Sequence, residues 1–162
     1  MIKITRFDEL YSGDTLGTPA MRAALLAHTA SDYYRTCQEL SGAARNEGPR
    51  FGVLVPALQQ TIELLVKAIT LKNVPDFNPR DYGHRTLEII DAYSTAVPVF
   101  AKIAGSDASR KLLSELTTGY LMVRYGEAHV AYDGETWAAF CVMVDEMLAV
   151  TLARADEKGT TV

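Results

Sequence analysis

Apolar residues recur along this chain at the three- and four-residue spacings of α-helices, most clearly between residues 51 and 72. One face of that stretch carries Leu58, Ile62, Leu65 and Ile69. Other apolar side chains widen this face until only a narrow polar edge remains, formed by Gln59, Gln60, Glu63, Lys67 and Thr70. A helix that is apolar over most of its circumference must be surrounded by other elements. We therefore expect this helix at the centre of a helical bundle.

The same periodicity predicts four more helical stretches, one of them broken. They cover residues 18–44, 84–103 with a break at Pro98, 106–123, and a last helix that starts at Asp133 or Thr136 and runs to about residue 155. Thr18 before Pro19 and Ser106 before Asp107 are typical helix starts, because Ser and Thr side chains cap free amide groups. No strand pairing or internal repeat is evident. The predicted fold is all-α, an up-and-down bundle of about five helices.

Length and composition predict a single domain. The chain has 162 residues, of which 48% are hydrophobic, enough for one sizeable core. Residues 1–17 show no sustained period and are expected to form an irregular N-terminal arm. Residues 18–155 form the predicted bundle, and residues 156–162 read as a flexible tail.

Charged and cysteine residues have simple structural interpretations in this bundle. Glu63 and Lys67 lie four residues apart in the favourable order, which we interpret as a surface salt bridge. Cys37 and Cys141 lie in apolar helical patterns without a CxxC motif, as expected of buried, reduced cysteines. Neither a signal peptide nor a run of apolar residues long enough for a membrane span is apparent. A cytoplasmic protein with no membrane association is therefore predicted.

The net charge of −4 and pI near 5.4 argue against broad electrostatic binding to nucleic acid. A local basic site is still possible where Arg80, His84 and Arg85 meet at a predicted helix start. Free amide groups and two cations there would suit a phosphate or a nucleotide. The alternative role for His84 is a structural hydrogen bond. The histidines lack the spacing of a zinc site, and the chain has no P-loop or GxGxxG motif, so no metal or cofactor is predicted.

A series of polar markers accompanies the apolar pattern. Their order along the chain is Tyr33, Tyr34 and Arg35, then Glu63 and Lys67, then His84, then Tyr120, Arg124, Tyr125 and Gly126. This order resembles the HEPN family over roughly residues 20–155. HEPN domains are small bundles of four to five helices, often homodimeric, which occur in prokaryotic defence and toxin systems and beside nucleotidyltransferases. The resemblance therefore implies a bundle that forms a homodimer.

Many HEPN proteins are metal-independent endoribonucleases in which an arginine is followed, four to six residues later, by a histidine. Arg124 and His129 fit that spacing. An imidazole can move the protons of the reacting hydroxyls while a guanidinium stabilises charge on the phosphate. The same spacing also occurs at Arg22 and His28, inside the first predicted helix. A structural role at the helix end is the alternative for Arg124.

Three functions follow from these patterns. The first is a HEPN-like module that associates with RNA or a nucleotide through Arg80, His84 and Arg85, with little or no catalytic activity, in a defence or regulatory system. The second is an endoribonuclease in which Arg124 and His129 act across a homodimer interface. The third is a structural module that binds another protein.

Overall fold

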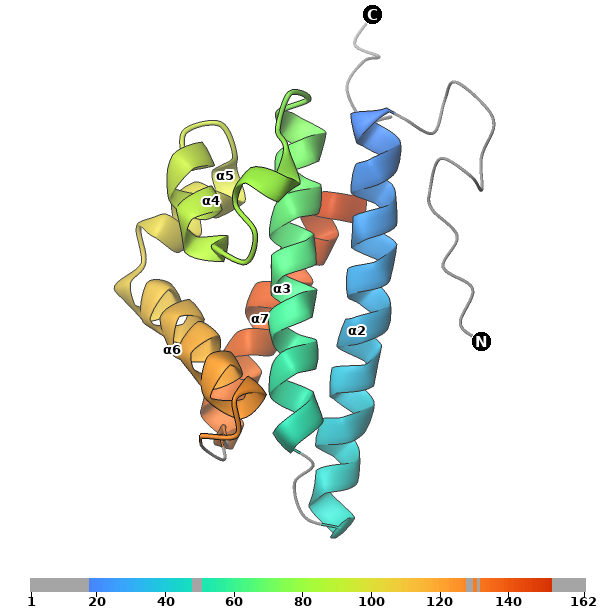
Figure 1. The fold of residues 1–162 in the computed structure, drawn as a ribbon, viewed down its shortest axis with the longest axis vertical. Helices are drawn as coiled ribbons and strands as arrows, with labels where there is room; N and C mark the ends of the chain where they lie inside the picture. Colours follow the sequence, from blue (N-terminus) through green and yellow to red (C-terminus); the bar gives the residue numbers. More distant parts are fainter. Residues whose placement is uncertain (1–17, 48–50, 128–129, 131, 153–162) are drawn as a thin grey trace, which may run out of the picture.

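The computed structural model describes residues 18–47, 51–127, 130 and 132–152, which form six α-helices and one short 3-10 helix, with no strand among them (Figure 1). The helices are α2 (Pro19–Glu47), α3 (Phe51–Asn73), α4 (Thr86–Tyr93), α5 (Pro98–Ala104), α6 (Asp107–Arg124) and α7 (Gly134–Leu152), with the 3-10 helix η1 (Pro79–Asp81) between α3 and α4. The all-α prediction is confirmed. The expected N-terminal arm and C-terminal tail lie outside the described residues.

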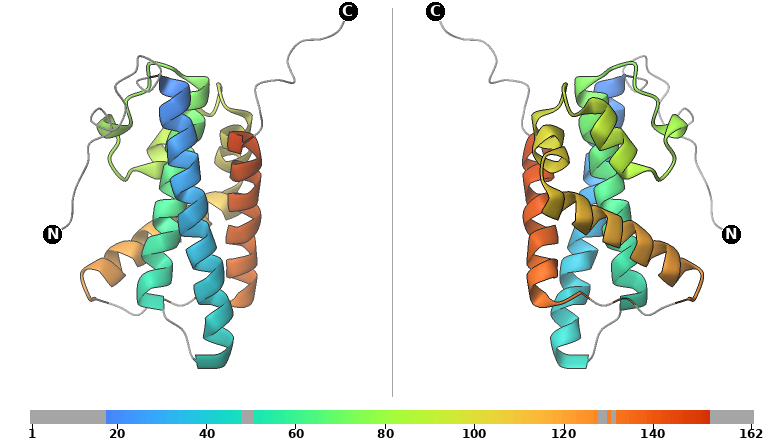
Figure 2. Two further views of the ribbon diagram at one scale, coloured as in Figure 1. Left: turned by 90° about the vertical axis from the view of Figure 1, so that its right-hand side faces the viewer. Right: turned by 90° about the vertical axis from the view of Figure 1, so that its left-hand side faces the viewer.

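The two longest helices, α2 and α3, run antiparallel, and α7 lies beside both (Figures 1 and 2). Helix α6 crosses them obliquely, while the short helices α4 and α5 sit near one end of the bundle. Helix α3 contacts α2, α4, α6 and α7, and Leu58, Leu65 and Ile69 are completely buried. The prediction that α3 is the central helix is confirmed.

Helix α3 is long and apolar enough to cross a membrane when judged by length and composition alone. Its most apolar 18-residue window falls within residues 53–73, and 72% of that window is buried inside the bundle. A central helix passes this test because its neighbours surround it on nearly all sides. The feature is thus accounted for by packing within the protein.

Three predicted helix starts are capped by the expected side chains. The Thr18 hydroxyl accepts a hydrogen bond from the amide of Met21, and the Ser106 hydroxyl accepts one from the amide of Ser109. At α7 the cap is Asp133 rather than Thr136: its carboxylate accepts the Thr136 amide at 2.7 Å. That bond also holds the pKa of Asp133 below its ordinary value.

Two prolines differ in their effect on the helices. Pro98 begins α5 and separates it from α4, as predicted. Pro56 lies inside α3, beyond its first turn. Because proline has no amide hydrogen, α3 lacks one of its intrahelical hydrogen bonds there.

The segment between α6 and α7 packs tightly against α6 at Gly119. A Cβ atom at this glycine would lie 3.1 Å from Cγ1 of Val130 and 3.4 Å from the Tyr132 hydroxyl, so glycine permits the close approach. Tyr132 also packs edge-on against Phe140. Its hydroxyl oxygen is buried and has no hydrogen-bond partner among the described residues.

Both cysteines are free thiols on helices that pack together. Cys37 on α2 is completely buried, and burial raises the pKa of its thiol to about 12. Cys141 on α7 is half-buried. The Tyr34 hydroxyl donates to the carbonyl oxygen of Cys141 at 3.5 Å, which joins α2 to α7.

Candidate functional site

The carboxylate of Glu63, in the middle of α3, is the polar centre of the candidate site. The residue is only 4% exposed. Its Oε1 accepts a hydrogen bond from Lys67 Nζ at 2.6 Å, and its Oε2 lies 2.7 Å from His84 Nδ1. The predicted surface salt bridge is therefore wrong in its location, since the Glu63 and Lys67 side chains are 5% and 12% exposed. Within the narrow polar edge of α3, Glu63 is contacted by His84 from the segment between α3 and α4.

These contacts determine how the His84 imidazole is oriented. A carboxylate that is bonded to an ammonium group stays ionised and can only accept hydrogen bonds. The Nδ1 atom of His84 must therefore carry a proton, which it donates to Glu63. The second ring nitrogen, Nε2, is left for other partners. The side chain of His84 is 60% exposed, so this nitrogen is accessible.

The segment from residue 74 to residue 85 is held in place by local contacts. Phe77 is buried and packs against the rings of Tyr82 and Tyr93. The Asn78 side chain accepts the Arg80 amide at 3.2 Å, which starts the short helix η1. Gly83 has a φ of 53°, a conformation that favours glycine, and this turn directs His84 back toward α3.

A hollow of about 670 Å³ lies between α2, the second half of α3 and residues 78–84. Its basic side chains are Arg22, Lys67, Arg80 and His84. Its apolar side chains include Leu25, Leu26, Leu64 and Leu71. Among the described residues, no aspartate or glutamate lines this hollow. The fold thus gathers basic and apolar groups from three elements into one concave surface.

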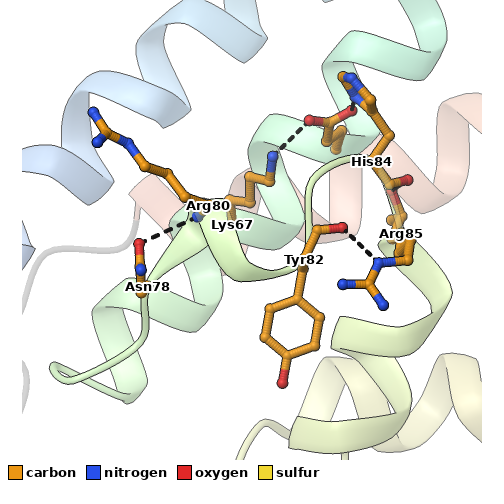
Figure 3. Close-up of polar contacts among 8 residues, drawn as sticks. Lys67, Asn78, Arg80, Tyr82, His84 and Arg85 are labelled. Atoms are coloured by element: carbon orange, nitrogen blue, oxygen red, sulfur yellow. Dashed lines mark hydrogen bonds and ion pairs between the residues drawn. The ribbon is translucent and has the colours of Figure 1, made fainter.

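The structure separates the three residues predicted to bind a ligand. Arg80 and His84 both line the hollow and Arg85 is not among its lining residues. Figure 3 shows the Arg85 guanidinium directed to the backbone oxygen of Tyr82. The Arg85 guanidinium donates to the carbonyl oxygens of Asp81 and Tyr82 and to the carboxylate of Glu88. Arg85 therefore makes local contacts just before α4 and is not among the residues that line the hollow, so its predicted role in ligand binding stays a prediction.

The predicted helix start at His84 is also displaced. Helix α4 begins at Thr86, and Arg85 occupies the capping position without a side-chain cap. The amide groups of the first turn of α4 therefore belong to residues that come after His84 in the chain. We expected helix-start amides to help bind an anion beside His84. The hollow instead includes the side chains of Lys67 and Arg22, which we had not predicted as part of this site.

Arg124 lies at the end of α6, away from the hollow, and its side chain is exposed. Its guanidinium donates to the Tyr120 hydroxyl at 3.2 Å and stands 5.9 Å from the ring centres of both Tyr120 and Tyr125. No carboxylate of the described residues forms an ion pair with it. His129 lies outside the described residues, so the pairing of Arg124 with His129 stays a prediction.

Two other observations bear on candidate sites. His28, which shares the Arg-to-His spacing with Arg22, is exposed on α2. Within residues 18–47, 51–127, 130 and 132–152, no group of three or more His, Cys, Asp or Glu side chains is arranged to hold a metal ion. The hollow beside His84 is the candidate site that combines basic and apolar side chains from three elements.

Comparison with known proteins finds no matching family model, no similar curated protein and no similar solved structure. The resemblance to HEPN domains therefore rests on the sequence markers alone. The functional argument depends on the geometry of the hollow.

Proposed function

We propose that this protein binds a small organic phosphate, such as a nucleotide, in the hollow between α2, α3 and residues 78–84. The observation that supports this proposal is the charge of the lining. Four basic side chains line the hollow, and no aspartate or glutamate among the described residues does, although the chain as a whole has a net charge of −4. Such a concentration of one sign of charge in a concave surface attracts an anion.

The lining residues divide into groups that suit the two parts of a nucleotide. The guanidinium groups of Arg22 and Arg80 can each form paired hydrogen bonds to phosphate oxygens, while the charge of Lys67 is offset by its ion pair with Glu63. The leucines of α2 and α3 offer an apolar surface for the base. A volume of about 670 Å³ lies within the usual range of small-molecule sites. A mononucleotide fits this description better than a long RNA strand.

The role that we propose is binding without catalysis, in keeping with the expected nucleotide-associated module. The experiment is calorimetric titration with ATP and, separately, with inorganic triphosphate. ATP should bind more tightly than triphosphate because the leucines contact the base. The affinity for ATP should fall steeply with added salt, since the attraction is electrostatic.

A matched pair of variants tests the location of the site. Arg80→Glu should weaken ATP binding by more than about tenfold, because it replaces an attractive charge with a repulsive one. Arg35→Glu is the control. Arg35 is an exposed residue of α2, the helix that also carries Arg22, but it does not line the hollow. Equal losses in the two variants, or no binding of ATP by the wild type, would contradict the proposal.

The second candidate function is a metal-independent endoribonuclease that uses Arg124 and His129 across a homodimer interface. One observation favours it: the Arg124 guanidinium is exposed and has no acidic partner among the described residues. Cleavage of RNA in the presence of EDTA, lost in His129→Ala, would support this function. Light scattering that shows only a monomer at micromolar concentration would contradict the shared site. The remaining alternative, a protein-binding module, predicts neither ATP binding nor RNA cleavage.

A further inference from the structure

We propose that His84 takes up a proton when a phosphate ligand binds, so that the affinity of the hollow rises as the pH falls. This inference rests on the proposed function, because it concerns the same site. It assigns two roles: His84 contacts the ligand through Nε2, and Glu63 acts through His84 as a positioning residue.

The first step of the argument concerns where an additional proton can go. Each oxygen of the Glu63 carboxylate already has a partner: Lys67 Nζ at 2.6 Å and Nδ1 of His84 at 2.7 Å. A neutral His84 therefore keeps its unprotonated nitrogen, Nε2, on the accessible side of the ring. Protonation changes this nitrogen from an acceptor into a charged donor. Only the charged form can donate a hydrogen bond to a phosphate oxygen from this position.

The second step concerns the charges around the hollow. Glu63 of α3 contacts His84, and Lys67 of α3, Arg80 of the preceding segment and Arg22 of α2 line the hollow together with it. Glu63 and Lys67 offset each other, which leaves two positive charges in the hollow when His84 is neutral. Protonated His84 adds a third. A phosphate with two or more negative charges interacts more favourably with three cations than with two, so ligand binding and protonation reinforce each other.

Glu63 makes this coupling specific rather than general. An exposed histidine without a fixed partner can present either nitrogen and can turn away from a ligand. The buried carboxylate holds the ring at Nδ1, so that an additional proton goes to Nε2, the other nitrogen of a ring that lines the hollow. The arrangement parallels the way in which buried carboxylates orient metal-binding histidines through their second nitrogen.

The test is calorimetric titration of the full-length protein with ATP in two buffers of different ionisation enthalpy, which counts the protons taken up on binding. The variant His84→Gln keeps a polar side chain but cannot gain charge. Because ATP itself changes protonation in this pH range, the quantity that matters is the difference between wild type and His84→Gln. We expect wild type to take up more protons than His84→Gln, by a fraction of a proton per ligand and mainly near neutral pH, because only a His84 that is neutral before the ligand binds can gain a proton.

The affinity should show the same difference. Between about pH 8 and about pH 5, the gain in ATP affinity should be about tenfold larger for wild type than for His84→Gln, as expected for one charge-assisted hydrogen bond. Arg80→Gln serves as a second control: it should weaken binding at both pH values without removing the extra proton uptake. Equal proton uptake by wild type and His84→Gln overturns the inference. Failure of ATP to bind at any pH overturns the proposed function as well.

The positioning role of Glu63 has its own readout, which does not depend on a variant that folds. Nitrogen-15 NMR of the wild-type protein above pH 8 should show His84 protonated at Nδ1 and unprotonated at Nε2. The opposite tautomer would show that Glu63 does not hold the ring as described, and would overturn this assignment. In Glu63→Gln the preference for the Nδ1-protonated form should decrease, because an amide can donate as well as accept.

Discussion

His84 and Arg124 are both basic side chains that reach the protein surface, but they differ in the contacts that hold them in place. His84 is fixed by a buried carboxylate and faces a hollow that three elements build together. Arg124 lies exposed at a helix end, where its described contacts are with the two tyrosines on either side of it in sequence. His84 is held by a residue that is distant in sequence, whereas the contacts of Arg124 are with its near neighbours in sequence. Spacing in the sequence indicated both regions, but only the first is assembled into a concave site by the described residues.

The first prediction tests whether the carboxylate is essential to the assembled site. Glu63→Gln should lower the free energy of unfolding by about 3 kcal/mol, because it leaves the nearly buried Lys67 without its counter-charge. Urea denaturation measures this change. Glu88→Gln is the control: it removes an exposed partner of Arg85 and should cost less than about 1 kcal/mol. Similar losses in the two variants would mean that the two ion pairs do not differ as described.

The second prediction compares Arg80, which lines the hollow with His84, and Arg124 at the end of α6. Arg80→Glu should weaken ATP binding by more than about tenfold, whereas Arg124→Glu should leave it within about twofold of wild type. Both substitutions change the net charge equally, so a general charge effect cancels in the comparison. If Arg124→Glu weakens ATP binding as much as Arg80→Glu, then the hollow is not the binding site.

A third prediction concerns a buried polar group that, unlike Glu63, has no partner among the described residues. Replacing Tyr132 with phenylalanine removes a buried hydroxyl and keeps the ring that packs on Phe140. We expect Tyr132→Phe to raise the free energy of unfolding by about 1 kcal/mol, since an unsatisfied buried hydroxyl is unfavourable. Thermal denaturation measures the change. A clear loss of stability would show that this hydroxyl does make a hydrogen bond in the folded protein.

The smallest effect is expected at the exposed ion pair between Asp91 on α4 and Arg110 on α6. Hydrogen bonds from Arg110 hold the pKa of Asp91 below its ordinary value. Because the folded protein has the lower pKa, the pair stabilises the fold above about pH 4 and this contribution is lost as the pH falls further. The difference in Tm between wild type and Arg110→Gln should therefore shrink in acid and in high salt. A difference that stays constant with pH would contradict this assignment.

The helices were largely predictable because their signals are local. Apolar spacing located α3 and the short caps Thr18 and Ser106 marked helix starts, features that depend on residues only a few positions apart. The burial of Glu63 was not predictable in this way. A four-residue spacing shows that Glu63 and Lys67 are neighbours, but it does not reveal which segment will cover them.

The composition of the candidate site was predicted only in part for the same reason. His84 and Arg80 were identified because they are close in sequence. Arg85 was included on that ground alone, yet it is used in local hydrogen bonds. Arg22 on α2 lies more than fifty residues before His84 in the chain, and no pattern within one sequence relates the two residues. Long-range packing decides which basic side chains share a surface.

The ion pair in the middle of α3 has a consequence for the chain before it folds. In the unfolded protein, residues 53–73 form a segment whose length and apolar character resemble those of a bilayer-crossing helix. Glu63 stands at its midpoint and Lys67 one turn later, and a charged side chain at the centre of such a helix opposes insertion by about 3 kcal/mol. Two residues that are buried together after folding therefore discourage a newly made chain from entering lipid. The same pair that orients His84 in the native protein also helps to direct the most apolar segment into its own bundle.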